Sequence, residues 1–236
     1  MKSFKWIIVT CLAFTAANAL AQKPKTIYSY KQPSANGTGK VYMGREIAEI
    51  MSFEGVSWLE RNTRSKEENT DLAISKLPVA SNSVVADIGA GSGFYTFRIA
   101  PKVPEGKVYA VEIQNDAITY LQKKAAELNT KNVMVIKGAE KSPNLPDGSI
   151  DLAIMVDVYH ELMYPHEFLQ AIKRALKPKG KLLLIEYKQE DPAVAIKEEH
   201  KMSVRQVSKE LKANGYHLVQ NGQFMPIQHF LVFQRD

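Results

Sequence analysis

Short apolar runs alternate with amphipathic segments along most of this chain. The stretches LAIMV (152–156) and LLLI (182–185) are apolar without alternation, which is typical of strands buried on both faces of a sheet. Strands that alternate with helices form a parallel sheet, so the pattern predicts a doubly wound α/β fold. The expected strands are 83–87, 107–112, 133–137, 152–157 and 181–186, with helices at 115–129 and 165–176.

The C-terminal part of the chain departs from this pattern. A helix is expected at 203–213, and two short apolar runs follow at 217–219 and 230–233. No helix separates these two runs, so we expect them to pair antiparallel at an edge of the sheet.

Two segments lie between residue 21 and the sheet domain, which we place at 79–236. Residues 22–40 are polar and contain proline, glycine and serine, which indicates an extended lead-in. Apolar positions between 41 and 78 predict short helices that form an N-terminal helical cap. Within the cap, the stretch ERNTRSKEE (60–68) is too charged to belong to a core.

The first 21 residues have the three regions of a secretory signal peptide. Lys2 and Lys5 precede an apolar run at 6–17, and the small residues Ala19 and Ala21 follow. The run is shorter than the roughly 20 residues that a membrane span needs. We therefore expect cleavage after Ala21, export to the periplasm or the medium, and no stable membrane insertion.

Composition narrows the classes of partner and of chemistry. The chain has 236 residues and 45% are hydrophobic, which excludes disorder. The formal net charge is +6, but the lysines are scattered without interleaved aromatic residues, so no nucleic-acid groove is expected.

The single cysteine, Cys11, lies in the leader, which excludes disulfides and thiolate metal sites from the rest of the chain. His160 and His166 are too far apart for a zinc-protease motif, and no metal site is expected. The oligomeric state is not indicated.

The first expected strand leads into a glycine-rich loop, DIGAGSG (87–93). Ligands of doubly wound sheets bind at the carboxyl ends of the strands, so this loop is a candidate binding site. Glycines permit a tight turn and close approach of a ligand, and free N–H groups at the next helix start favour an anion. A dinucleotide fingerprint needs a further glycine where this chain has Phe94, which disfavours a nicotinamide dehydrogenase.

Three further strand ends carry residues that can bind a ligand or take part in a reaction. Glu112 ends the second strand, where a carboxylate accepts hydrogen bonds from both hydroxyls of a ribose. The turn GAE (138–140) follows the third strand, where its backbone N–H groups and a side chain can contact the edge of an adenine ring. The segment DVYHE (157–161) brings a carboxylate, a phenol and an imidazole to the mouth of the sheet.

Together these motifs resemble those of class I S-adenosylmethionine-dependent methyltransferases. The resemblance rests on DIGAGSG (87–93), Glu112, GAE (138–140), PDGSID (146–151) and LKPKG (176–180), and it covers roughly residue 78 to the C-terminus. YMGR (42–45) and WLER (58–61) are more loosely similar to segments of exported bacterial members. The resemblance implies a Rossmann-like, seven-stranded sheet with an antiparallel last strand, and S-adenosylmethionine as the cofactor.

The resemblance also implies roles for individual residues. The glycine loop is expected to pack against the methionine part of the cofactor, with Asp87 holding its amino group. Glu112 would bind the ribose, and Ile113 would lie beside the adenine. Where many members have Asp after the third strand's glycine, this chain has Ala139 and then Glu140. The expected cofactor-binding residues are Asp87, Gly89, Ala90, Gly91, Gly93, Glu112, Ile113, Ala139, Glu140 and Asp157.

The methyl acceptor is expected beside the cofactor, under a lid formed by the N-terminal helices. His160 is the candidate general base, because an imidazole takes up a proton near neutral pH; the alternative is a structural histidine hydrogen-bonded beside the strand end. The expected substrate-pocket or lid residues are Tyr42, Arg45, Trp58, Tyr159 and Tyr187, with Arg61 beside them. For Tyr42 and Trp58 the alternative is ordinary packing, and for the two arginines it is surface charge.

Two functions follow from this interpretation. The first is a methyltransferase that acts on a small molecule or a protein side chain by in-line displacement. The second is an exported, non-catalytic binder of S-adenosylmethionine or a related nucleoside.

Overall fold

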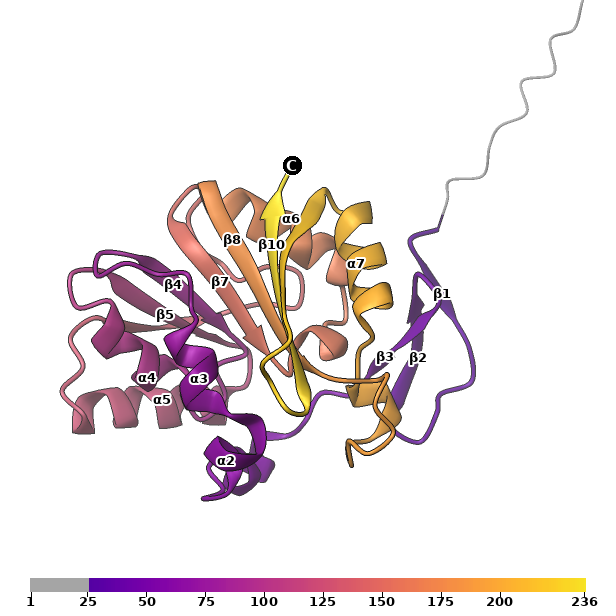
Figure 1. Cartoon of the computed structure of the whole chain (residues 1–236), viewed down its shortest axis with the longest axis horizontal. Coiled ribbons are helices and arrows are strands. Elements are labelled where there is room, and N and C mark those ends of the chain that lie inside the picture. Colours follow the sequence, from indigo (N-terminus) through magenta and orange to yellow (C-terminus); the bar gives the residue numbers. More distant parts are fainter. Residues whose placement is uncertain (1–25) are drawn as a thin grey trace, which may run out of the picture.

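The centre of the protein is a seven-stranded sheet (Figure 1). The computed structural model describes residues 26–236, so the predicted signal peptide at 1–21 lies outside the described residues. The strands are β4 (Val84–Ile88), β5 (Lys107–Glu112), β6 (Val133–Lys137), β7 (Ile150–Val156), β8 (Leu176–Tyr187), β9 (Tyr216–Gly222) and β10 (Gln228–Arg235). Their order is β6-β5-β4-β7-β8-β10-β9; β4 to β8 are parallel, and β10 is antiparallel to both of its neighbours. This confirms the predicted doubly wound, Rossmann-like sheet with an antiparallel last strand.

The C-terminal strands confirm the predicted antiparallel pair at an edge of the sheet, and they differ from the prediction in one detail. Within the pair β9 is outermost, whereas β10 lies between β8 and β9, and its first six residues are all buried, as expected of a strand covered on both faces. β8 begins at Leu176, so the segment 177–180, expected to be a helix stop, belongs to the strand.

Helices cover both faces of the sheet. They are α3 (Thr70–Ser75), α4 (Thr96–Ile99), α5 (Asn115–Glu127), α6 (Pro165–Ala175) and α7 (Val204–Ala213). On one face, Leu182 and Leu184 of β8 share a core with residues of α6 and α7. On the other face, Leu183 and Ile185 share a core with residues of α3 and α4. This alternation explains why the strand is apolar along its whole central part.

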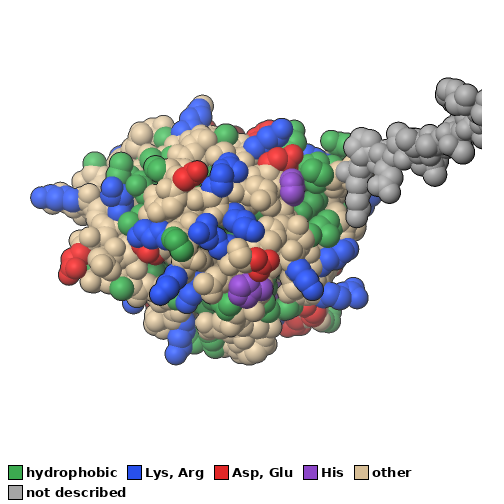
Figure 2. Space-filling view, turned by 90° about the horizontal axis from the view of Figure 1, so that it is seen from above, with side chains coloured by type: hydrophobic (Ala, Val, Ile, Leu, Met, Phe, Trp, Pro, Cys, Tyr) green, Lys and Arg blue, Asp and Glu red, His purple; other side chains and the backbone are tan. Residues whose placement is uncertain are grey.

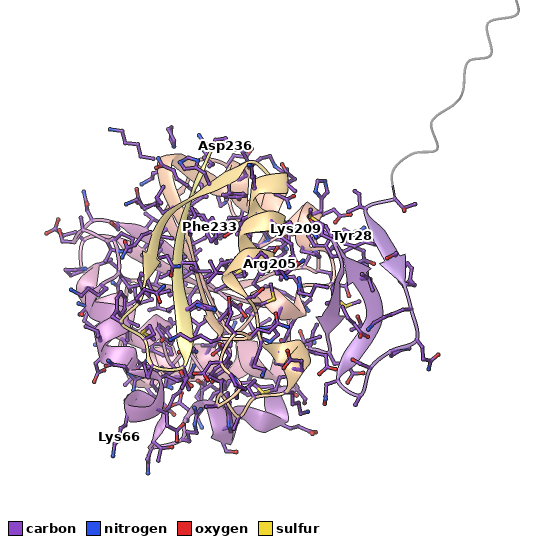
Figure 3. All side chains as sticks on the ribbon, turned by 45° about the vertical axis from the view of Figure 1, so that its right-hand side comes forward. Tyr28, Lys66, Arg205, Lys209, Phe233 and Asp236 are labelled. Carbon is purple, nitrogen blue, oxygen red and sulfur yellow. The ribbon has the colours of Figure 1, made fainter. Side chains whose placement is uncertain are left out.

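The N-terminal segment opens with strands rather than helices. β1 (Tyr28–Tyr30), β2 (Gly37–Tyr42) and β3 (Arg45–Ala48) form a separate three-stranded sheet beside α7, where Tyr28, Arg205 and Lys209 are labelled in Figure 3. The predicted helical cap therefore differs from the structure over 41–48. The cause is the tight turn between β2 and β3, where Met43 (φ 50°) and Gly44 (φ 95°) both have left-handed backbones, as in the favoured hairpin turns.

Short helices follow the small sheet and lead to the main one. They are η1 (Phe53–Gly55), α1 (Val56–Leu59) and α2 (Arg64–Glu68), after which α3 begins at Thr70. The prediction that 60–68 is too charged for a core is wrong for Arg64 and Glu68, which are both buried. The two side chains neutralise each other: Arg64 Nε lies 2.9 Å from Glu68 Oε2.

None of the helices within 26–236 has the length and apolarity needed to cross a bilayer. On the face shown in Figure 2, Lys and Arg side chains are dispersed among uncharged and acidic ones.

Candidate functional site

A cavity of about 620 Å³ opens at the carboxyl ends of the parallel strands. Its walls come from the ends of β4, β5, β6 and β7, from the N-terminal segment 36–64, and from the segment 187–200 that follows β8. Of the predicted site residues, it brings together Gly89, Gly91, Glu112, Ile113, Ala139, Glu140, Asp157, His160, Trp58 and Tyr187. The convergence follows from the topology, because the carboxyl ends of parallel strands meet at one edge of the sheet.

The glycine loop requires its glycines for two different reasons. Gly89, Gly91 and Gly93 all have left-handed backbones, with φ of 67°, 53° and 74°. Gly89 and Gly91 line the cavity, whereas Gly93 faces the core, where a Cβ would lie 2.4 Å from the Phe97 ring. Ala90 is also buried in the core and does not line the cavity. The predicted contact surface of the loop is therefore reduced to Gly89 and Gly91.

Glu112 connects the end of β5 to the glycine loop. Its Oε2 accepts a hydrogen bond from the Gly91 N–H at 3.0 Å, and its Oε1 accepts from the N–H groups of Ile113 (2.6 Å) and Gln114 (3.1 Å). The two segments that carry the sequence prediction are therefore in direct contact. Ile113 is 37% exposed and lies on the same wall of the cavity as Glu112.

The two aspartates of the predicted site lie in different environments. Asp87 does not line the cavity; its Oδ2 accepts a hydrogen bond from the Thr96 hydroxyl at 2.6 Å. Burial raises the pKa of Asp87 to about 6, although the hydrogen bonds from Thr96 act in the opposite direction. Asp157 does line the cavity, and its Oδ2 accepts from Gln228 Nε2 at 2.8 Å. Asp157 Oδ1 is buried and has no hydrogen-bond partner within 26–236.

A buried ionic cluster supports the wall beside Asp157. Arg64 lines the cavity and forms its ion pair with Glu68 beneath the surface. Glu68 Oε1 also accepts hydrogen bonds from Arg61 (2.7 Å) and from the Tyr187 hydroxyl (2.9 Å). Burial, together with repulsion from Glu68 and Glu186, raises the pKa of Asp157 well above its usual value.

His160 lies at the other end of the cavity, within a second polar cluster. Its Nδ1 is 2.6 Å from Glu186 Oε2, and its Nε2 is 3.1 Å from His200 Nδ1. Burial lowers the pKa of His160, but the attraction of Glu186 and hydrogen bonds to Glu161 and Glu186 outweigh it and raise the pKa to about 10. A raised pKa favours the protonated ring, which cannot take up a further proton, and the role of His160 as general base stays a prediction.

Three predicted pocket residues do not line the cavity. Tyr42 is buried, and its hydroxyl accepts a hydrogen bond from Asn214 Nδ2 at 2.7 Å. Arg45 forms a two-point ion pair with Glu210 (2.9 and 3.1 Å) and donates to the His160 carbonyl at 2.9 Å. Tyr159 is fully buried and donates to Glu210 at 2.7 Å. These residues attach the small sheet to α7 and support the segment that holds His160.

Trp58 is the one predicted N-terminal lid residue that reaches the cavity. It is 37% exposed, and the Arg61 guanidinium lies 4.1 Å from the centre of its ring. Its ring is also 6.4 Å from that of Tyr187, another lining residue. Arg61 itself does not line the cavity.

Several lining residues were not predicted from the sequence. Arg64 was assigned to an exposed stretch, although its i,i+4 spacing to Glu68 is the spacing of an ion pair on one helix face. His200 carried no signal, because it lies 40 residues from His160 and outside any motif. Met51 and Gln114 are joined by a hydrogen bond from Gln114 Nε2 to the Met51 carbonyl at 3.1 Å, which depends on tertiary structure alone.

Comparisons with known proteins agree with this geometry. A family model described as a methyltransferase domain matches residues 80–230. A probable cobalt-precorrin-6B C(15)-methyltransferase (decarboxylating) of Sulfurisphaera tokodaii is 30% identical over 128 residues, which cover 53% of this chain and 65% of that protein. A Methanocaldococcus jannaschii protein of the same description is 38% identical over 74 residues, covering 31% of this chain and 39% of that protein. The chain thus spans 65% or less of these curated relatives. The crystal structure of a SAM dependent methyltransferase from Aquifex aeolicus has a TM-score of 0.73 at 26% identity, covering 78% of this chain and 98% of that one.

The strand order and the cavity at the strand ends define the architecture of a class I methyltransferase. The family match covers more than half of the chain, and the chain belongs to the methyltransferase-domain family. The cofactor of this fold and family is S-adenosylmethionine.

Proposed function

We propose that this protein transfers a methyl group from S-adenosylmethionine to a small-molecule or protein acceptor by in-line displacement. The observation that carries the proposal is the hydrogen bond between Glu112 and the Gly91 N–H, because it joins the glycine loop and the acidic strand end in one cavity wall. The cavity of about 620 Å³ is also within the usual range for a cofactor site, roughly 300–1,000 Å³.

The residues of this cavity fit the polar groups of the cofactor. We infer that Asp157 binds the amino group, because its buried Oδ1 lacks a partner within 26–236 and a cationic donor would satisfy it. Asp87 acts indirectly, since its carboxylate is held by Thr96 beneath the loop. Glu112 accepts hydrogen bonds from the ribose hydroxyls. Ile113, Ala139 and Glu140 surround the adenine, with Ile113 supplying apolar contact.

The methyl acceptor is proposed to bind at the His160 end of the cavity. When bound, the cofactor supplies a methyl group on a positively charged sulfur, which is electrophilic without further activation. The protein's part is to align the acceptor atom, and such positioning contributes roughly 7–11 kcal/mol to a displacement. His160 and Glu161 line the end of the cavity where the acceptor binds, and Trp58 with Tyr187 excludes water from the cofactor. The two archaeal relatives are named for methylation of cobalt-precorrin-6B, which supports a small-molecule acceptor.

Isothermal titration with S-adenosylmethionine tests the first half of the proposal, and the expected result is one site per chain. Incubation with a panel of alcohols, thiols, amines and proteins, followed by detection of S-adenosylhomocysteine, tests the second half. Absence of cofactor binding by the folded protein would refute the function.

The second candidate is an exported binder of the same cofactor that methylates nothing. Its support is the signal-peptide pattern at 1–21, from which we also propose export to the periplasm or the medium. S-adenosylmethionine is made in the cytosol, so an exported enzyme would depend on an outside supply. Cofactor binding without S-adenosylhomocysteine release from any acceptor would favour this candidate. Fractionation of cells that express the full chain tests the export.

A further inference from the structure

Two histidines and a glutamate meet at the acceptor end of the cavity. His160 and Glu161 belong to the turn η3 (Tyr159–Glu161) that follows β7, and His200 ends the turn η4 (Glu198–His200). One ligand atom from each side chain lies within 4.8 Å of the other two. We propose that these three residues form a site for one divalent transition-metal ion of the zinc class, with an open position that faces the cofactor cavity.

The distances between the three atoms match those of a metal site. His160 Nε2 and His200 Nδ1 are 3.1 Å apart, His200 Nδ1 and Glu161 Oε1 are 3.5 Å apart, and His160 Nε2 and Glu161 Oε1 are 3.8 Å apart. Two ligands that bind one zinc ion at about 2.1 Å with a tetrahedral angle are about 3.4 Å apart. All three edges are therefore close to the required length, and only small side-chain movements separate this arrangement from a coordinated one.

The second layer of contacts holds the ligands in the orientation that a metal needs. His160 Nδ1 is bonded to Glu186 Oε2 at 2.6 Å, which leaves Nε2 directed at His200. Glu186 is fully buried, and its other oxygen accepts from the Tyr159 N–H at 2.8 Å. A carboxylate behind a ligating histidine is the usual second layer of a zinc site. Glu161 Oε1 accepts from the Met51 N–H at 3.1 Å, which fixes the carboxylate and leaves a lone pair free for the ion.

Charge and donor type select the kind of ion. Glu161 and Glu186 together contribute two negative charges beside the two imidazoles, and a divalent cation neutralises them in a cluster where His160 and Glu186 are both buried. Two imidazole donors favour zinc or a neighbouring transition metal, since Mg²⁺ and Ca²⁺ prefer oxygen ligands. Metal binding would displace the proton that the two carboxylates otherwise hold on His160.

The open position gives the metal ion a part in methyl transfer, namely binding the acceptor; this part of the inference rests on the proposed function. Two histidines and one glutamate leave one tetrahedral position free, as in catalytic rather than structural zinc sites. His160, Glu161 and His200 all line the cavity that contains Glu112 and Gly89, so the free position faces the place proposed for the acceptor. A dication there lowers the pKa of a bound hydroxyl or thiol, which identifies alcohols, phenols and thiols as the acceptor class.

The site is tested by metal titration of the full-length, chelator-treated protein. Isothermal titration with ZnCl2 is expected to show one ion per chain, and Co²⁺ is expected to give the visible absorption of a low-symmetry, four- or five-coordinate site. His200→Ala and Glu161→Gln should each weaken Zn²⁺ binding by more than about tenfold, because even the loss of an outer-layer partner costs that much. His217→Ala, which removes an exposed histidine outside the cavity, should bind Zn²⁺ like the wild type.

Two results would overturn the inference. One is a wild-type protein that binds neither Zn²⁺ nor Co²⁺ at micromolar concentration; the other is equal binding by the wild type and by both ligand variants, shown to be folded by circular dichroism. A parallel titration of the wild type with S-adenosylhomocysteine separates the two proposals. Nucleoside binding without metal binding defeats the metal site alone, whereas metal binding without nucleoside binding defeats the proposed function.

Discussion

The substitution Glu112→Gln tests the structural basis of the proposed cofactor site. In the structure, Glu112 Oε1 accepts two backbone N–H groups and Oε2 accepts the Gly91 N–H at 3.0 Å. A glutamine has a single acceptor oxygen, which will face the two donors of Ile113 and Gln114. Its amide nitrogen then faces Gly91, where one donor opposes another, and the attachment of the glycine loop to β5 is lost at this point.

The size of the effect follows from the hydrogen bonds that are changed. A hydrogen bond to a charged group contributes about 1.5–3 kcal/mol, so the free energy of unfolding should fall by about 2 kcal/mol. The ribose hydroxyls lose the same charged acceptor. Since 1.4 kcal/mol corresponds to a factor of ten, the dissociation constant for S-adenosylmethionine should rise by about 10- to 100-fold.

Both quantities are measured on one preparation, by urea unfolding and by isothermal titration with S-adenosylmethionine. Glu105→Gln is the matched control, because Glu105 is exposed and lies outside the cavity, and it should leave both values unchanged. A folded Glu112→Gln protein that binds the cofactor as tightly as the wild type would refute the assignment of Glu112 to the ribose.

Two further substitutions test other parts of the site. Burial raises the pKa of Asp87 to about 6, above about 3.9 in an unfolded chain, so its contribution to stability is complete below about pH 4 and is lost as the pH rises through 6. The unfolding free energy of Asp87→Asn relative to the wild type should therefore rise by about 1–2 kcal/mol between about pH 5 and pH 8 in urea titrations, and a pH-independent difference would contradict the shift. Trp58→Ala should weaken cofactor binding and lower turnover several-fold while leaving the fold intact, because the ring lines the cavity and is 37% exposed. Leu128→Ala, at an exposed apolar residue outside the cavity, is its control, and equal affinities and turnover for the two variants would show that Trp58 is not a lid.

The main sheet was predictable from sequence because its strands are buried on both faces. Continuous apolar runs such as Leu182–Ile185 have few alternatives in a folded chain, and their spacing fixed the order of strands and helices. The small N-terminal sheet was not predictable in this way. Its strand β3 is only four residues long, and Ile47 with the following Ile50 and Met51 matches helical spacing. The turn at Met43-Gly44 decides the outcome, and a single glycine is a weak signal.

The residues of the candidate site likewise fall into a predictable and an unpredictable group. Residues that directly follow parallel strands, such as Glu112 and Asp157, were found because topology gathers strand ends in one place. Arg64 and His200 were not found, because their positions depend on the packing of irregular segments over the cavity. A buried ion pair such as Arg64–Glu68 has the same sequence pattern as a solvated one.

One wall of the cavity has a consequence for comparing this protein with its relatives. Residues 36–64 contribute lining side chains, yet they precede the stretch 80–230 that the family match covers. The cavity wall is thus built partly by the stretch that the family match covers and partly by residues that precede it. Replacing residues 36–64 with the corresponding segment of a relative should therefore reshape the cavity, while the contact between Glu112 and the Gly91 N–H, which lies within 80–230, stays in place.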